Sequence, residues 1–435
     1  MKLAVIGGAG VRTPLLIHGL TRSDVPISSV CLYDPDQTRL AIIAPLAARL
    51  SGGATVTASS SVAECVEGAD FVFTSIRVGG IEARARDEAT ALDHGVIGQE
   101  TVGPGGFGMA MRTIPHIVEY AKEVERRAPD AWIINFTNPV GIITEAVHTA
   151  TGAKIIGICD TPTELFEEIA HALGLASQEC HFDYFGLNHL GWVREVYHDG
   201  RPQLHRLWDD PARLASIYRV PLFDPVFLRE LRLLPTEYVY YYYRARDAFE
   251  NVKRAGRSRG HVIQQLNVKL FEDLAEPDAD ARIVYEAYLA ARDGGYMQIE
   301  SGTTAPRKPS PWAALTGYDK IALSVLRAIH FNTGAIIPLN VCNRGNLPEL
   351  ETDDVVEVPC TVTRNGALPL HVGPVPTAVL ELLLRVKDYE RRTVKAALSG
   401  DRDAARVALA RNPLVADAAL ADRLIDAMTA GQSKA

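Results

Sequence analysis

Short apolar runs alternate with amphipathic stretches along the first 160 residues of the chain. Lys2–Ile6 is an apolar run followed at once by a glycine-rich turn, and Pro14–Leu20 reads as the start of a helix that Thr13 can cap. Further buried strands are expected at Ser29–Tyr33, Ala54–Ala58, Asp70–Ser75, Ala131–Asn135 and Lys154–Cys159. Helices are expected between them near Ser61–Gly68, Gly106–Ala128 and Val140–Thr149. This alternation predicts an α/β fold in which residues 1–160 form a Rossmann-like, doubly wound parallel sheet.

The pattern is less regular after residue 160. Helical periodicity is present at Ser258–Glu276, Ala281–Asp293, Tyr318–Phe331 and Thr377–Leu398. A β-rich stretch lies between the last two, and its Asn365-Gly366 pair is typical of a hairpin turn. We therefore expect residues 161–435 to form a mixed α+β domain.

Composition and charge argue against nucleic acid and membranes as binding partners. The chain has 435 residues and a formal net charge of −8, which gives no general attraction to nucleic acid or to an anionic membrane. No apolar run approaches the ~18 residues that a membrane span needs, and the apolar start is too short for a signal-peptide core. Six cysteines are scattered without close pairs, as in reduced thiols. We expect a cytoplasmic protein that binds neither nucleic acid nor membrane.

The first turn and the second strand together indicate a dinucleotide site. Gly8 and Gly10 follow the first strand, although the third glycine of the usual fingerprint is missing. Asp34 ends the second strand, where a carboxylate can accept both ribose hydroxyls of NAD and would repel a 2′-phosphate. The alternative is that Asp34 only begins a turn and caps the next helix. We favour NAD, and the predicted cofactor-binding residues are Gly8, Gly10, Val11, Arg12, Asp34 and Ser75.

Polar residues follow several of the predicted strands, at the sheet edge where such folds bind ligands. They include Ser75 to Arg77, Asn135 to Asn138, and the pair Cys159-Asp160. His189 follows Cys159 by thirty residues, and a thiolate and an imidazole can hold a divalent metal while leaving positions open for substrate oxygens. Two ligands are too few for a structural metal site. The residues alone leave a catalytic metal and two buried, unrelated side chains as open alternatives.

Five tyrosines occupy six positions in the stretch TEYVYYYYRARD, residues 236–247. One interpretation is an aromatic core segment, because aromatic residues favour half-buried surfaces. The other is that one phenol exchanges a proton with a substrate. The residues themselves do not distinguish one tyrosine from the other four.

Several motifs in order along most of the chain carry a resemblance to a known family. They are VIGGAGVRTP at the start, IRVGG (76–80), GQETVGPGGFGMAMR (98–112), NFTNPVGI (135–142), GICDTP (157–162), GLNHLGW (186–192), TEYVYYYY (236–243) and HFNTG (330–334). With these motifs the chain resembles the family 4 glycoside hydrolases, which depend on NAD and a divalent metal. The segments GLNHLGW and YVYYYY resemble most closely the 6-phospho-β-glucosidase branch.

The resemblance implies a mechanism that differs from the usual two-carboxylate one. NAD⁺ oxidises C3 of the sugar, a base removes the acidified proton from C2, and the C1 substituent leaves by elimination. Water then adds at C1, and NADH reduces C3 again. A divalent metal on the C2 and C3 oxygens stabilises the charge that develops. The implied cofactors are NAD⁺ and Mn²⁺ or another divalent ion.

The resemblance also assigns roles to residues of the metal and catalytic sites. Cys159 and His189 match the metal ligands, and Tyr238 matches the base, which would need its pKa lowered by a cation. Asp160 is ambiguous, because α-acting relatives carry an aspartate there as general acid whereas β-acting relatives often carry asparagine. Asp160 could protonate the leaving group, orient a metal-bound water, or simply cap a helix.

Substrate recognition falls, by the same resemblance, to Arg84, Asn138 and Arg259. Arginine suits a phosphate because its fork donates two parallel hydrogen bonds. Relatives often carry serine in the glycine turn, where this chain has Arg12 after Gly10 and Val11. Either Arg12 replaces the phosphate contact of that serine, or the phosphate is not required. We favour a phosphorylated substrate.

The expected function is hydrolysis of 6-phosphorylated β-glucosides, such as cellobiose 6-phosphate, by a homo-oligomer (dimer or tetramer). The first alternative is a family member that acts on an unphosphorylated or α-linked glycoside. A hydroxy-acid dehydrogenase is a weaker alternative, because such enzymes lack a metal-ligand pair. A non-catalytic NAD-binding regulator is disfavoured by the presence of Cys159, His189 and Tyr238 together.

Overall fold

The computed structural model describes residues 1–276, 278–303 and 317–430. The first elements are β1 (Lys2–Ile6), α1 (Thr13–Leu20), β2 (Ser29–Tyr33), α2 (Gln37–Leu50), β3 (Thr55–Ser59), α3 (Val62–Val66), β4 (Phe71–Thr74), α4 (Gly80–Asp93), α5 (Gly103–Arg127), β5 (Trp132–Asn135), α6 (Val140–Ala150), β6 (Lys154–Gly157) and α7 (Thr161–Leu173). Next come the short helix η1 (Ser177–Glu179), β7 (Cys180–Leu187), β8 (Leu190–His198), β9 (Arg201–Pro202), α8 (His205–Trp208), α9 (Pro211–Ala215), α10 (Pro225–Leu231), β10 (Leu234–Pro235), η2 (Glu237–Val239), α11 (Tyr240–Tyr243) and α12 (Ala245–Ala255). The remaining elements are α13 (Arg259–Ala275), α14 (Ala281–Gly294), α15 (Gln298–Ser301), α16 (Gly317–Phe331), β11 (Ala335–Cys342), β12 (Val355–Thr363), β13 (Gly366–Pro369), α17 (Thr377–Ser399), α18 (Arg402–Arg411) and α19 (Ala418–Ala430).

Strands β1 to β6 form a parallel sheet in the order β3-β2-β1-β4-β5-β6. This is the strand order of the Rossmann dinucleotide-binding fold, so the predicted fold class is confirmed. The register aligns Ile6 with Tyr33 and Thr74, and aligns Asn135 with Thr74 and Gly157. The residues that follow these strands therefore emerge at one edge of the sheet.

The sheet does not stop at the end of the parallel part. Strand β11 lies antiparallel to β6, with Asn340 opposite Gly157, and β12 and β13 extend the sheet further. The predicted hairpin is confirmed, since β12 ends at Thr363 and β13 begins at Gly366. A division into domains at residue 160 stays a prediction, because the same sheet continues on both sides of it.

A second, smaller sheet carries the turn that holds His189. Its strands are ordered β10-β8-β7, with β9 paired to β8. Strands β7 and β8 are antiparallel and are joined by the two residues Asn188 and His189.

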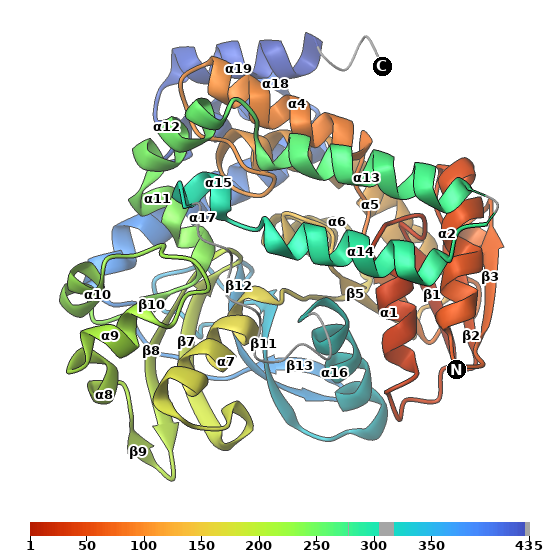
Figure 1. The fold of residues 1–435 in the computed structure, drawn as a ribbon, viewed down its shortest axis with the longest axis horizontal. Helices are drawn as coiled ribbons and strands as arrows, with labels where there is room; N and C mark the ends of the chain where they lie inside the picture. Colours follow the sequence, from red (N-terminus) through yellow and green to blue (C-terminus); the bar gives the residue numbers. More distant parts are fainter. Residues whose placement is uncertain (277, 304–316, 431–435) are drawn as a thin grey trace.

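Helices α13 and α14 lie side by side across the face of the molecule that also exposes α1 and α2 (Figure 1). A small apolar cluster, separate from the main core, holds this helix pair against α1 and α2. The hydroxyl of Tyr285 on α14 also donates to the carbonyl of Val11 in the glycine turn, at 2.8 Å. The cluster contains Leu15, Leu46, Leu270, Tyr285 and Tyr288. The helix pair is thus attached directly to the predicted nucleotide-binding unit.

The predicted elements lie within one to three residues of the observed ones. The tyrosine stretch, for which no element is predicted, forms the short helices η2 and α11. Several other elements also have no predicted counterpart, among them α2, α4 and α7. In α4 the buried face includes the charged residues Arg84, Asp87 and Glu88 rather than only apolar ones, which hides its periodicity. No helix in the described ranges is long and apolar enough to span a membrane. The six cysteines are all free thiols.

Candidate active site

A cavity of about 480 Å³ opens at the edge of the sheet where the parallel strands end. It receives residues from the glycine turn, from the ends of β2, β4, β5 and β6, from α4 and α5, from the β7–β8 turn, from η2 and from α13. Eleven of the thirteen predicted site residues line it: Gly10, Val11, Arg12, Asp34, Ser75, Arg84, Asn138, Cys159, Asp160, His189 and Tyr238. Arg259 lines an adjoining cavity of about 150 Å³, and Gly8 lines neither cavity.

The glycine turn is shaped by close backbone contacts. Gly7 has φ +94°, and a Cβ there would lie 2.2 Å from the carbonyl oxygen of Ser75. A Cβ on Gly8 would lie 2.8 Å from the Cβ of Leu32, so Gly8 permits the turn to pack on β2. The amides of Gly7 and Gly8 both donate to the carbonyl of Tyr33, at 2.9 and 2.8 Å. The turn then leads into α1, whose N-terminus can meet an anion.

The carboxylate of Asp34 is fixed at the end of β2 by backbone donors. Its two oxygens accept from the amides of Ala9, at 3.2 Å, and Asp36, at 3.0 Å. Burial raises the pKa of Asp34, while these two hydrogen bonds lower it. Arg39, the neighbouring cation, pairs with Asp36 at 3.3 Å and with Glu82 at 3.5 Å. The arrangement fits a ribose with free hydroxyls better than a 2′-phosphate, because the nearby positive charge is already paired.

Cys159 and His189 reach the cavity from different sheets. Cys159 follows β6, and burial, with the charges of Glu357 and Asp160, raises the pKa of its thiol well above the ordinary range. Burial lowers the pKa of His189 to about 4, so the imidazole is neutral near pH 7 and can act as a ligand. Its Nδ1 lies 2.6 Å from Oγ1 of Thr101. A metal here would have to displace the thiol proton of Cys159.

His189 adopts an uncommon backbone conformation, with φ +62°. Such residues cluster at functional sites, where the surrounding structure holds them in place. The neighbouring Asn188 donates to Glu357 at 3.2 Å, and this buried carboxylate also accepts from Tyr184 at 2.6 Å and from Asn340 at 2.8 Å. Burial raises the pKa of Glu357 to about 7, although these three donors lower it. Glu357 thus supports the His189 turn, a role that no sequence pattern indicates.

The predicted metal-ligand set consists of two side chains, Cys159 and His189. Within the described ranges, no group of three or more His, Cys, Asp and Glu side chains is arranged to hold a metal. A thiolate and a neutral imidazole on a cavity wall nevertheless fit a catalytic ion whose other positions are taken by water or substrate. Asn138 adds a buried Oδ1 on the same cavity wall, and this atom has no hydrogen-bond partner among the residues that the structure describes.

Of the five clustered tyrosines, Tyr238 is the one that lines the larger cavity. Its ring stacks on the imidazole of His189, with centroids 3.8 Å apart and planes 5° apart. Burial raises the pKa of Tyr238 well above its usual range, and the charges of Glu100 and Glu237 raise it further, while Tyr296 lowers it. The protein's own groups therefore do not provide the lowered pKa that the sequence led us to expect.

The other tyrosines of the stretch are in packing positions. The hydroxyl of Tyr240 donates to the carbonyl of Glu300 at 3.1 Å, and that of Tyr241 donates to the sulfur of Met297 at 3.6 Å. Tyr240 and Tyr241 are buried in the main core, and Tyr242 and Tyr243 pack against it.

Asp160 occupies the N-cap position of α7, but its side chain makes no capping hydrogen bond. Its carboxylate lies 3.8 Å from the guanidinium of Arg12, and both side chains are partly exposed. The capping alternative is therefore not observed. The carboxylate faces the cavity next to a cation of the glycine turn.

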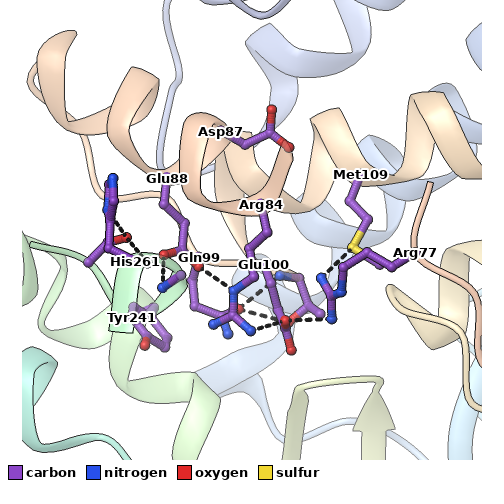
Figure 2. A network of polar contacts seen from close by, with 12 residues as sticks. Arg77, Arg84, Asp87, Glu88, Gln99, Glu100, Met109, Tyr241 and His261 are labelled. Carbon is purple, nitrogen blue, oxygen red and sulfur yellow. Dashed lines mark hydrogen bonds and ion pairs between the residues drawn. The ribbon is translucent and has the colours of Figure 1, made fainter. Parts of the chain in front are cut away.

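A buried ion-pair network surrounds Arg84 (Figure 2). Arg84 donates to Glu88 at 2.8 Å and also pairs with Glu100, which accepts from Arg77 at 2.9 Å. Burial disfavours the charged form of Glu100, but the charges of Arg84 and Arg77 outweigh this and lower its pKa. Glu88 also accepts from the amide of Gly260 at 2.6 Å. Arg84 is thus held rigidly between α4, the loop before α5, and the start of α13.

Glycines in the segment GQETVGPGGFG explain how Glu100 reaches this network. A Cβ on Gly105 would lie 2.2 Å from the carbonyl oxygen of Gln99, and one on Gly106 would lie 2.4 Å from the carbonyl carbon of Thr101. The loop that carries Glu100 can therefore lie directly on the first turn of α5. The sequence motif covers this loop, but nothing in the sequence alone marks Glu100 or Thr101 as a site residue.

The smaller cavity brings the predicted substrate arginines together. Arg12 and Arg84 line both cavities, and Arg259 lines the smaller one. Arg259 is 7% exposed, its Nη2 donates to the carbonyl of Arg292, and its Nη1 has no partner among the described residues. Arg292, which the sequence did not single out, lines both cavities. Cationic side chains from the glycine turn, α4, α13 and α14 therefore converge on one region.

Comparison with known proteins assigns a family to this site. Residues 2–175 match the sequence profile described as family 4 glycosyl hydrolase, and residues 184–415 match that of its C-terminal domain. The chain belongs to the family 4 glycosyl hydrolases.

Individual relatives are similar over nearly their whole length. A probable 6-phospho-β-glucosidase of Bacillus subtilis (strain 168) is 32% identical, and the match covers 98% of this chain and 95% of that protein. A phospho-α-glucosidase of Clostridium acetobutylicum is 27% identical over 98% of this chain and 96% of its own. The structure of the Thermotoga maritima 6-phospho-β-glucosidase with manganese, NAD⁺ and glucose 6-phosphate has a TM-score of 0.83 at 28% identity, covering 100% of this chain and 98% of that one.

Proposed function

We propose that this protein is a 6-phospho-β-glucosidase that hydrolyses 6-phosphorylated β-glucosides, such as cellobiose 6-phosphate, with NAD⁺ and Mn²⁺. The observation that carries the proposal is one cavity shared by the nucleotide turn, the Cys159 thiol, the His189 imidazole and the Tyr238 phenol. The names of the similar proteins and the ligands in the Thermotoga structure support it. Cytoplasmic location and homo-oligomeric assembly are part of the same proposal.

The residues present fit both cofactors. The glycine turn and the fixed carboxylate of Asp34 would hold NAD⁺, which supplies reversible oxidation at C3 of the sugar. Cys159 and His189 would hold the divalent metal, which supplies Lewis acidity next to the sugar hydroxyls. A neutral imidazole and a thiol that must lose its proton are the donors that a borderline divalent ion requires.

Tyr238 would remove the proton from C2 of the oxidised sugar. Its phenol is buried and its pKa is raised, so it can act as a base only when a cation nearby stabilises the phenolate. The stacking contact with His189 puts it beside one of the proposed metal ligands. This contact limits proton removal to the metal-loaded enzyme.

Asp160 would deliver a proton to the departing group at C1 or orient a water. Its carboxylate faces the cavity, is not used to cap α7, and is near Arg12. Arg84, Asn138 and Arg259 would bind the sugar and its phosphate. Arg84 is suited to orientation rather than to a mobile contact, because two carboxylates already fix its guanidinium.

A second candidate is the α-linked or unphosphorylated glycoside. The side chain of Asp160 favours the α-linked case, since the resemblance places an acid there in α-acting relatives, and one similar protein is a phospho-α-glucosidase. Arg12 in place of the usual serine favours a changed phosphate contact.

Nitrophenol release from paired substrates tests both candidate functions. The β-glucoside 6-phosphate and the plain β-glucoside would be compared with NAD⁺, Mn²⁺ and a thiol, and then with each omitted. Release from the phosphorylated substrate alone, lost without NAD⁺ or metal, is the expected result. Release from the plain glucoside instead, or only from α-linked substrates, would replace the first candidate with the second.

A further inference from the structure

Four arginines line the smaller cavity, and they differ in whether a carboxylate neutralises their charge. Arg84 pairs with Glu88 and Glu100, and Arg12 lies 3.8 Å from Asp160. Arg259 and Arg292 differ, because among the described residues no carboxylate lies within ion-pair distance of either guanidinium. Two cations on one cavity wall are therefore left without an acidic partner in contact. The buried Nη1 of Arg259 has no hydrogen-bond partner at all in the described chain.

Arg292 is held in place by hydrogen bonds rather than by an acid. On α14, its Nη1 donates to the hydroxyl of Tyr288 at 2.9 Å, and that hydroxyl donates to Oδ1 of Asn267 on α13 at 2.8 Å. Its backbone carbonyl accepts from Nη2 of Arg259. The first residue of α13 and the last turn of α14 are thus joined, and the two arginines that extend from them line the same cavity.

The electrostatic surroundings are unfavourable for an isolated cation. Burial lowers the pKa of Arg292 to about 10, and the positive charges of Arg12 and Arg84 add to this, while Tyr288 and Glu100 oppose it. Burial and the charge of Arg84 likewise lower the pKa of Arg259, while the charge of Glu300, which lines the same cavity without forming an ion pair with Arg259, opposes this. A phosphoryl dianion between Arg259 and Arg292 would offset the cost of burying these two positive charges. Guanidinium groups bind such a group through paired hydrogen bonds.

We propose that Arg292 acts with Arg259 to bind the phosphoryl group of the sugar substrate, so that the α13–α14 pair selects phosphorylated over plain sugars. This rests on the proposed function, because it requires a phosphorylated substrate. Arg292 also lines the larger cavity, where the diphosphate of NAD⁺ has the same chemistry. The two phosphoryl sources are separated by measuring sugar and dinucleotide binding independently.

The test compares Arg292→Gln with Arg282→Gln in the full chain loaded with NAD⁺ and Mn²⁺. Arg282 is the matched control, since it is exposed on the same helix and pairs only with Glu286 among the described residues. Inhibition constants would be measured for glucose 6-phosphate and glucose, and the dissociation constant for NAD⁺ by titration. Arg292→Gln is expected to raise the inhibition constant of glucose 6-phosphate by about 10- to 100-fold. The inhibition constant of glucose and the dissociation constant of NAD⁺ should not change. Arg292→Lys should recover part of the loss.

Each other outcome overturns the inference. Equally weakened binding of glucose and glucose 6-phosphate would mean that Arg292 only maintains the shape of the cavity. Weakened binding of NAD⁺ alone would assign Arg292 to the dinucleotide site. Unchanged glucose 6-phosphate binding would remove it from the site. If the unmodified protein itself fails to prefer glucose 6-phosphate over glucose, the proposed function fails first, and the role of Arg292 fails with it.

Discussion

The imidazole of His189 lies flat against the phenol of Tyr238, with ring centroids 3.8 Å apart. The two residues come from different elements, the β7–β8 turn and η2, and meet at the wall of the larger cavity. Because the protein raises the pKa of this phenol, a base at Tyr238 depends on positive charge supplied next to it. In the proposed mechanism this contact would couple metal binding at His189 to proton transfer at Tyr238.

Tyr238→Phe keeps the ring and its stacking but removes the hydroxyl. We expect exchange of the C2 proton with solvent to fall by at least about 100-fold, because a positioned base contributes that much or more. NAD⁺ affinity and thermal stability should be nearly unchanged. Deuterium incorporation at C2, followed by NMR, checks this. Tyr240→Phe is the matched control, since Tyr240 does not line the larger cavity and its hydroxyl donates to the carbonyl of Glu300. Undiminished exchange would assign the base elsewhere.

Cys159→Ser replaces the thiol at the end of β6 with a harder donor. Mn²⁺ binding should weaken by about 100-fold or more, because a serine hydroxyl does not ionise to replace a thiolate. NAD⁺ binding should stay near normal. Titration of free Mn²⁺ by electron paramagnetic resonance measures the change. Cys180→Ser, at a thiol on β7 that does not line the cavity, provides the control. An unchanged Mn²⁺ titration would exclude Cys159 from the site.

Arg12→Ser removes the cation that faces Asp160 and introduces the residue that relatives often carry. If Arg12 contacts the phosphate, KM for the phosphorylated glucoside should rise by about 3- to 10-fold, a modest change because the side chain is about one-third exposed and water screens its charge. KM for the plain glucoside should not change. Steady-state kinetics on both substrates measures the two KM values. An equal loss of kcat on both would show that Arg12 acts through Asp160 instead.

Glu390 lies in a buried charged cluster away from the cavity. Lys387 contacts Glu390 at 2.6 Å and Glu145 at 2.8 Å, and all three side chains are buried. Burial raises the pKa of Glu390 to about 7, although Lys387 lowers it. Between the unfolded pKa of 4.5 and the folded pKa of about 7, the folded protein therefore holds a proton here that the unfolded chain has lost. This group thus lowers the free energy of unfolding as pH rises through that range.

Glu390→Gln does not titrate, so its free energy of unfolding should increase relative to the unmodified protein over the same pH range. The two pKa values differ by about 2.5, which corresponds to on the order of 3 kcal/mol at most. Urea unfolding at several pH values measures the difference. Glu381→Gln, at an exposed position of the same helix, is the control for loss of a carboxylate charge on α17. A difference for Glu390→Gln that stays constant with pH would contradict the raised pKa.

The sequence predicts the nucleotide half well because its signals are local. Strand period, glycine turn and terminal acid each occupy a few consecutive residues, and the parallel register brings the strand ends to one edge. The arginine–carboxylate network could not be predicted in the same way. Arg84, Glu88 and Glu100 interact only after α4, the loop before α5 and α13 have packed, and buried charges on α4 hide its amphipathic pattern.

The choice of Tyr238 among five tyrosines depended on the resemblance, since five adjacent phenols have the same chemistry. The structure separates them by position, because the short helices η2 and α11 turn Tyr240 to Tyr243 away from the larger cavity. Arg292 had no local signal, because an arginine near the end of an amphipathic helix is usually on a solvated face.

The antiparallel pairing of β11 with β6 affects how the chain is made. Strand β6 ends at Gly157 and its partner begins at Ala335, so about 180 residues must be synthesised before the outer edge of β6 is covered. At roughly 5–20 residues per second, this leaves an apolar edge unpaired for about 10 to 40 seconds on the ribosome. The nascent protein should therefore need a chaperone during this interval, and truncation before residue 335 should yield aggregates rather than an isolated nucleotide-binding unit.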